Sequence, residues 1–193
     1  MKKKTAADYL TTEWSGGKTT QLVIEPGDAR YADRDFLWRI SSATVESEES
    51  DFTPLPDYHR VIATLQGEIT LSHNGGEAIL LRPYELHRFE GSDRTHSSGR
   101  CRDFNLMLRR NRAEGSVTVI RVTEQERRIC PEPWTESMLL YCAEGRCMVC
   151  AEGEGLELGK GESLTGNRSG ELRLTALEDG AVLLLCQMRR LVS

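Results

Sequence analysis

The segment Arg102–Arg110 carries side chains that are well suited to binding chemistry. If this segment is a β-strand, Asp103, Asn105, Met107 and Arg109 share one face, because successive side chains alternate between the faces of a sheet. An acid, an amide and a base then follow one another, and such a face either meets water or lines a polar pocket. Asp103 could orient a nearby arginine, and Asn105 could bind a ligand oxygen or an amide.

Arg39 is the strongest single candidate for binding an anion. In the extended segment Phe36–Val45, alternation places Leu37, Arg39, Ser41 and Ala43 on one face. If the opposite, aromatic face packs against a second layer, Arg39 and Ser41 share a cavity face, where the planar guanidinium suits a carboxylate. The pattern alone equally fits an exposed arginine on a half-buried strand, or one held by a structural acid.

Arg60 begins another extended segment, in phase with Ile62 and Thr64. Together with Arg39 it could clamp a dianion or two carboxylates. The alternative is a salt bridge at the rim, which would contribute only about 0–1 kcal/mol if exposed.

A tryptophan and two glycines precede the first long strand. Gly16 and Gly17 allow a backbone to approach a ligand closely or to adopt positive φ. Trp14 could then wall a pocket, and Thr19 could supply a hydroxyl group. A plain turn with a packed tryptophan is the alternative.

Short extended segments separated by turn residues predict the scaffold for these side chains. Asn74-Gly75 is a strong tight-turn signal, and only Thr123–Arg128 has a briefly helical pattern. The spacing predicts an all-β sandwich or barrel. The expected strands are Thr19–Glu25, Phe36–Val45, Tyr58–Gln66, Glu68–His73, Glu77–Leu81, Asp103–Arg110, Ser116–Val122, Met138–Ala143, Arg146–Ala151, Leu156–Leu158, Glu171–Ala176 and Ala181–Met188. The acidic segment Glu46–Asp51 is expected to be a solvated loop.

The two halves of the chain echo each other. Val61–Leu71 and Met138–Val149 each contain an apolar strand, a glycine turn and a second strand. This layout resembles the cupin jelly roll used twice, which predicts an all-β bicupin. We expect a ligand-binding barrel over residues 12–112 and a mainly structural barrel over residues 113–193, because the second copy is poorer in histidine and aromatic residues.

Four ordered blocks resemble the HutD family: Glu13–Thr20, Asp35–Ala43, Pro56–Arg60 and Asp103–Arg110. The resemblance implies a bacterial, cytoplasmic bicupin associated with histidine utilisation or stress response. It also implies that the protein binds a small carboxylate, such as formylglutamate, and tunes that pathway without a firm enzymatic activity. The ligand-binding residues expected on this basis are Trp14, Thr19, Arg39, Ser41, Arg60, His87, Asp103 and Asn105.

Many cupins bind a metal through a His-x-His pair, a glutamate and a later histidine, and this pattern is missing here. Only His87 resembles the histidine of the second cupin motif, and one ligand does not hold a transition metal. We therefore expect neither a metal nor another cofactor. His59, His73 and His96 are interpreted as turn or surface residues.

Three closely spaced cysteines superficially suggest zinc. If Cys147 and Cys150 lie in one strand, however, their sulfur atoms point to opposite faces and cannot share an ion. With Cys142 they are better interpreted as small buried hydrophobes.

The net charge and the hydropathy of the chain limit the classes of molecule that it could bind. The net charge of −5 and the pI near 5.5 argue against a general binder of nucleic acid or of anionic membranes. No apolar run approaches the roughly 20 residues that span a bilayer. The basic N-terminus lacks the apolar core of a signal peptide, so we expect a cytoplasmic protein with six reduced cysteines. A homodimer is compatible with the sequence, which does not reveal it.

The favoured hypothesis is a non-enzymatic bicupin that binds an anionic metabolite, with no catalytic residue assigned. The alternative is a metal-independent isomerase or hydrolase that uses His87 as a base, with Tyr58 or Tyr84 as a nominal acid. A third possibility is a structural module whose barrel is simply a filled core.

Overall fold

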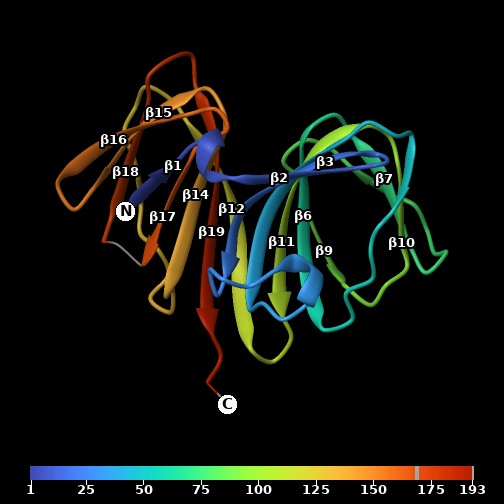
Figure 1. The fold of residues 1–193 in the computed structure, drawn as a ribbon. Helices are drawn as coiled ribbons and strands as arrows, with labels where there is room; N and C mark the ends of the chain where they lie inside the picture. The colour runs from blue at the N-terminus through green and yellow to red at the C-terminus, as the bar shows by residue number, and fades with distance from the viewer. Residues whose placement is uncertain (168–169, 193) are drawn as a thin grey trace. The chain divides into compact units, whose positions relative to one another are not determined.

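The computed structural model describes residues 1–167 and 170–192, which form two compact units of β-strands (Figure 1). One unit, here the N-terminal barrel, comprises Leu10–Glu114 with the described residues after Arg190. The other, the C-terminal barrel, comprises Gly115–Arg190 together with Met1–Tyr9. The first nine residues thus pack with the second half of the chain.

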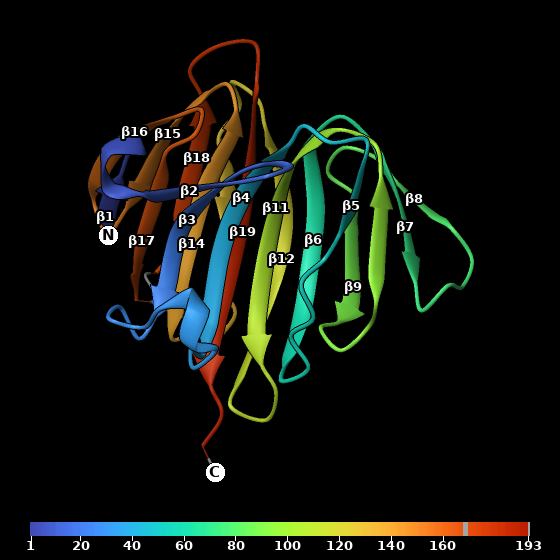
Figure 2. The ribbon, with the colours of Figure 1, turned by 45° about the vertical axis from the view of Figure 1, so that its right-hand side comes forward.

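The N-terminal barrel consists of two antiparallel sheets. The four-stranded sheet has the order β5 (Glu49–Asp51), β10 (Thr95–Ser98), β7 (Ile69–His73) and β8 (Ile79–Leu81). The six-stranded sheet has the order β2 (Leu10–Trp14), β3 (Gly17–Glu25), β4 (Trp38–Val45), β11 (Cys101–Arg109), β6 (Tyr58–Gln66) and β9 (Leu86–Glu90). Figure 2 shows β3, β4, β11 and β6 side by side in this larger sheet.

The register of the central strands brings the predicted polar residues together. Met107 of β11 lies opposite Arg39 of β4 and Arg60 of β6. Two residues along the strand, Asn105 lies opposite Ser41 and Ile62. Because directly opposed residues share a face, side chains from three strands converge on one patch of the sheet.

Tight turns join successive strands of the N-terminal barrel. Asn74 and Gly75, between β7 and β8, both have positive φ (56° and 73°), and the N–H of Gly76 closes the turn over them by donating to the carbonyl oxygen of His73 at 2.9 Å. Gly67, between β6 and β7, also has positive φ (74°), and a Cβ atom there would lie 2.5 Å from the carbonyl oxygen of Arg100. A side chain at Gly67 would therefore disturb the turn.

The C-terminal barrel repeats the same topology. Its larger sheet has the order β1 (Lys2–Lys4), β17 (Ser163–Asn167), β14 (Ser137–Glu144), β19 (Ala181–Arg190) and β12 (Ala113–Val122). Its smaller sheet has the order β13 (Arg127–Ile129), β18 (Leu172–Ala176), β15 (Arg146–Ala151) and β16 (Glu154–Gly159). Strands β12 to β19 thus pair in the same order as β4 to β11, which gives two eight-strand repeats.

The interiors of the two barrels differ in chemistry. The C-terminal barrel holds one large apolar cluster that includes Ile120, Met138 and Leu140. The apolar core of the N-terminal barrel instead includes two smaller clusters, one around Leu71 and the other around Phe36. Buried polar residues occupy β4, β6 and β11 of the same barrel. A polar interior is therefore found in the N-terminal barrel.

The structure corrects several local expectations. Thr123–Arg128 is not helical, and Arg127–Ile129 forms the edge strand β13. Helical turns occur instead at η1 (Ala6–Asp8) and η2 (Tyr31–Asp33). The end of the acidic segment Glu46–Asp51 pairs with β10 as strand β5. In the part of the chain that is described, no helix has the length and apolarity needed to cross a membrane.

Candidate functional site

A cavity of about 350 Å³ lies inside the N-terminal barrel. Its floor is the polar patch of the six-stranded sheet, and β5 with the residues that follow it closes the opposite side. The lining residues are Thr12, Trp14, Thr19, Tyr31, Arg39, Ser41, Ala43, Val45, Ser50, Asp51, Phe52, Thr53, Arg60, Asp103, Asn105 and Met107.

Arg39 is buried and held in place by neutral partners. Its Nε donates to Oε1 of Gln21 at 2.8 Å, and its Nη1 donates to Oγ of Ser41 at 3.2 Å. The guanidinium carbon lies 4.3 Å from the centre of the Tyr31 ring, a cation–π contact. Burial lowers the pKa of Arg39, and the nearby Arg34 lowers it further. The side chain is thus oriented without its charge being neutralised.

Arg60 is more isolated. The residue is only 6% exposed, and its Nε has no hydrogen-bond partner among the described residues. The guanidinium carbon lies 4.9 Å and 5.0 Å from the ring centres of Phe52 and Phe89. Burial lowers the pKa of Arg60 to about 10, since desolvation disfavours the charged form. Among the described residues, neither Arg60 nor Arg39 has a carboxylate within ion-pair distance.

Asp103 is the buried acid of the cavity, with an exposed fraction of 7%. Its Oδ1 accepts the backbone N–H of Ala43 at 2.9 Å. Burial raises the pKa of Asp103 to about 6, although the Ala43 hydrogen bond and the charges of Arg60 and Arg39 oppose this effect. The cavity therefore contains two guanidinium groups and one carboxylate, which leaves an excess of positive charge at neutral pH.

Further polar atoms beside these charges lack partners. Oδ1 of Asn105 and Oγ1 of Thr64 are buried without a hydrogen bond in the described part of the chain. Thr64 lies directly opposite Asp103 in the sheet. Buried polar groups are nearly always paired with protein or ordered water, so these atoms mark where a ligand or water would be accommodated.

Aromatic side chains surround the cations. Tyr31, on the short helix η2, has the Arg34 guanidinium over its ring at 3.9 Å as well as that of Arg39. Trp14 is 40% exposed and lines the cavity from β2. The adjoining Gly17 is needed for packing, because a Cβ atom there would lie 1.9 Å from the carbonyl oxygen of Thr44. That close approach is to backbone, so it assigns Gly17 no role at a ligand.

The structure brings together seven of the eight residues expected to bind a ligand: Trp14, Thr19, Arg39, Ser41, Arg60, Asp103 and Asn105. His87 does not line this cavity. Sequence reasoning missed Tyr31 and Phe52, because each comes from a segment that carries no chemical pattern of its own, and it also missed Gln21 of the expected strand Thr19–Glu25. The alternation of β3 would have placed Gln21 on the same face as Thr19.

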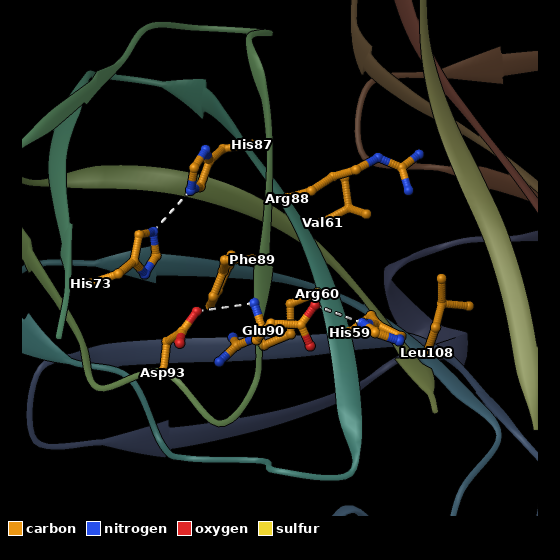
Figure 3. Close-up of a pocket in the computed structure, with 10 residues that line it drawn as sticks. All are labelled: His59, Arg60, Val61, His73, His87, Arg88, Phe89, Glu90, Asp93 and Leu108. Atoms are coloured by element: carbon orange, nitrogen blue, oxygen red, sulfur yellow. Dashed lines mark hydrogen bonds and ion pairs between the residues drawn. The ribbon is translucent and has the colours of Figure 1, made fainter. Parts of the chain in front are cut away.

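His87 lies in a second pocket of about 420 Å³ at the edge strand β9 (Figure 3). Its Nε2 is 2.8 Å from Nε2 of His73, and Nδ1 of His73 is 2.8 Å from Oγ1 of Thr95. Burial and His73 lower the pKa of His87. The interpretation of His73 as a turn or surface residue is therefore incomplete, since it pairs with His87. Arg60 lines both pockets.

Metal-binding and thiol chemistry find little support in the geometry. Among the described residues, no group of three or more His, Cys, Asp or Glu side chains is placed to hold a metal ion. Cys142 and Cys147 are buried in the apolar core of the C-terminal barrel. Burial raises the pKa of the Cys142 thiol to about 12, which makes it unreactive. All six cysteines are unpaired.

The chain matches the HutD family model over residues 6–184. Protein Ves of Cronobacter sakazakii is 33% identical over 108 residues, which cover 53% of this chain and 56% of that protein. The matched region thus spans little more than half the length of this curated relative.

Solved structures of similar fold cover almost the whole chain. A conserved protein of unknown function from Pseudomonas aeruginosa PAO1 is 25% identical with a TM-score of 0.82, and the match covers 97% of both chains. HutD from Pseudomonas fluorescens SBW25, in a formate condition, is 24% identical with a TM-score of 0.76 over 98% of both chains. A cupin barrel protein from Leptotrichia buccalis, 10% identical, has a TM-score of 0.59 over 97% of this chain and 96% of that one. The fold is therefore the bicupin fold, with two jelly-roll barrels.

Proposed function

Because the chain belongs to the HutD family, we propose that it is a bicupin that binds a small anionic metabolite inside its N-terminal barrel without transforming it. The observation that carries this proposal is the presence of two buried guanidinium groups, Arg39 and Arg60, for which the described residues provide no carboxylate within ion-pair distance. Keeping a charge buried and unpaired costs free energy. A bound anion would remove that cost, which is the thermodynamic basis for affinity.

A carboxylate fits the donors of the cavity. Arg39 is fixed by Gln21 and Ser41, and a rigid guanidinium offers parallel N–H groups to a planar carboxylate. A cavity of about 350 Å³ suits a small metabolite. A formylglutamate-like compound carries carboxylates for these donors, and binding it would let the protein act as a sensor or buffer that modulates histidine utilisation or a related catabolic or stress pathway. The proposal places the protein in the cytoplasm, where its unpaired cysteines stay reduced.

Thermal denaturation with added carboxylates tests this function. Formate, glutarate and formylglutamate should raise the melting temperature at constant ionic strength, because a ligand that binds only the folded state stabilises it. Sodium chloride at the same ionic strength is the salt control. No shift with any of the three carboxylates would refute carboxylate binding.

A pair of variants assigns the shift to the cavity. Arg39→Ala should abolish the shift, because it removes the oriented guanidinium. Arg82→Ala is the matched control, since Arg82 is exposed and pairs only weakly with Glu85 at 4.0 Å. An unchanged shift in Arg39→Ala would rule out Arg39 as the anchor.

The contact between His73 and His87 favours a second candidate function, a metal-independent isomerase or hydrolase. Two imidazoles within hydrogen-bond distance of each other beside a pocket are able to transfer protons. The hydroxyl of Tyr58, however, donates to the carbonyl oxygens of Arg34 and Phe36, both at 3.0 Å, and Tyr58 does not line this pocket. Turnover of a candidate substrate that is lost in His87→Gln would establish this function over simple binding.

A further inference from the structure

The polar patch inside the N-terminal barrel has a donor end and an acceptor end. At the donor end, Arg39 and Arg60 lie on either side of Met107. Their guanidinium groups offer only N–H donors, because arginine has no acceptor atom. This end of the cavity is therefore complementary to oxygen atoms that carry negative charge.

The acceptor end lies further along the same strands. Asp103 lies opposite Thr64, four residues before Met107, so the backbone positions of the two ends are about 13 Å apart along the strand. The arginine side chains shorten this distance, since the charges of Arg60 and Arg39 lower the pKa of Asp103. Oδ1 of Asp103 accepts the N–H of Ala43, whereas Oδ2 has no hydrogen-bond partner among the described residues. Asn105 lies between the two ends, and its Oδ1 is also unpartnered.

A plain dicarboxylate would fit only the donor end. Any carboxylate that fills the cavity comes close to Asp103, and like charges repel strongly where water is excluded. The other acid of the cavity, Asp51, is exposed and already paired with His96 at 2.9 Å. Asp103 is thus the buried charge that a ligand has to accommodate.

Resting on the proposed function, we propose that the ligand carries an ammonium group as well as carboxylates, and that it is a small acidic amino acid. Its two carboxylates would bind Arg39 and Arg60, and its ammonium would bind the free oxygen of Asp103. Charges then balance in pairs, two carboxylates with two guanidinium groups and one ammonium with one carboxylate. No buried charge of the cavity is left without a partner.

A purely structural role explains Asp103 less well. An acid that oriented the arginines would form an ion pair with one of them, and none is present in the described part of the chain. Among the described residues, the Asp103 carboxylate accepts one hydrogen bond, from the N–H of Ala43, for which a neutral amide oxygen would suffice. The positive charges of Arg60, Arg39 and Arg102 favour its ionised form from a distance, but no ion pair in the described part of the chain occupies its second oxygen.

Isothermal titration calorimetry with L-glutamate and glutarate tests this inference, because the two compounds differ only in the ammonium group. The wild-type protein should bind L-glutamate about tenfold or more tightly than glutarate, as expected for a charge-assisted hydrogen bond. Asp103→Asn keeps the oxygen that accepts from Ala43 and removes the charge. This variant should lose the preference and bind glutarate at least as tightly as the wild-type protein does.

The outcomes separate the two proposals. If the wild-type protein binds glutarate as tightly as L-glutamate, or if Asp103→Asn keeps the original preference, the inference is overturned while carboxylate binding stands. If formate, glutarate and L-glutamate all fail to bind, both proposals fall. A melting curve of Asp103→Asn without ligand shows whether the variant is folded. Should it be unfolded, the ratio of the two affinities in the wild-type protein alone decides.

Discussion

Replacing Arg60 by methionine should stabilise the ligand-free protein while abolishing anion binding. Burial lowers the pKa of Arg60 from its ordinary value to about 10. At about 1.4 kcal/mol for each tenfold change in a protonation constant, keeping this charge in the barrel costs roughly 3 kcal/mol. The cost is fully present at neutral pH and is relieved only as the pH rises above about 10, where the folded protein would release the proton.

The rings of Phe52 and Phe89 offset part of this cost. A desolvated cation–π contact contributes about 1–2 kcal/mol, and methionine would lose it while retaining apolar contact with both rings. We therefore expect Arg60→Met to raise the free energy of unfolding by about 1–2 kcal/mol, as for other buried charges replaced by apolar side chains. Binding sites often reduce stability in this way.

Urea denaturation of the ligand-free protein measures this difference, and carboxylate titration of the same variant measures binding. Arg39→Met is the matched comparison. It leaves Oε1 of Gln21 without its donor, so we expect it to lose about 1–2 kcal/mol of stability. If Arg60→Met were instead destabilised by more than 1 kcal/mol, Arg60 would be a structural anchor and the argument from unpaired charge would be wrong.

Three further predictions address pH and the backbone. Burial raises the pKa of Asp103 from 3.8 to about 6, so the contribution of this carboxyl group to stability is complete below about pH 4 and is lost as the pH rises through 6. In urea titrations, the wild-type protein should therefore lose roughly 3 kcal/mol of stability between pH 4 and pH 7 relative to Asp103→Asn. Burial and His73 lower the pKa of His87, so the contribution of the neutral imidazole to folding stability is lost as the pH falls below about 6.5. His87→Gln should therefore lose less stability than the wild-type protein between pH 7 and pH 5. Equal losses in the two proteins would contradict this. Gly17→Ala would place a Cβ atom 1.9 Å from the carbonyl oxygen of Thr44 and should cost about 2–3 kcal/mol in the same assay, whereas an unchanged midpoint would contradict the tight packing of β3 on β4.

The sequence was informative wherever a side-chain pattern had a short period. Alternation along the strand placed Asp103, Asn105 and Met107 on one face, and all three residues line the cavity. The glycine turns after two apolar strands, at Gly67 and Gly145, predicted the two barrels, and both glycines have positive φ (74° and 71°). These features are local, since neighbours along the chain determine them.

The sequence was misleading where partners are distant. His73 and His87 are fourteen residues apart and in different sheets, so nothing near either one predicts their contact at 2.8 Å. Strand β5 depends on β10 for its hydrogen bonds, and its acidic sequence resembles a solvated loop. Edge strands of this kind form because a partner strand is available, and the β-propensity of their own residues does not reveal that partner.

The sequence by itself determined which side chains share a strand face, and hence that Arg39 and Ser41 point the same way. Only the tertiary structure decided that this face turns inward, that Arg60 joins it across β11, and that no carboxylate of the described residues forms an ion pair with either arginine. The physical reason is that alternation fixes the relative orientation of neighbours, whereas burial and charge pairing depend on strands brought together from distant parts of the chain.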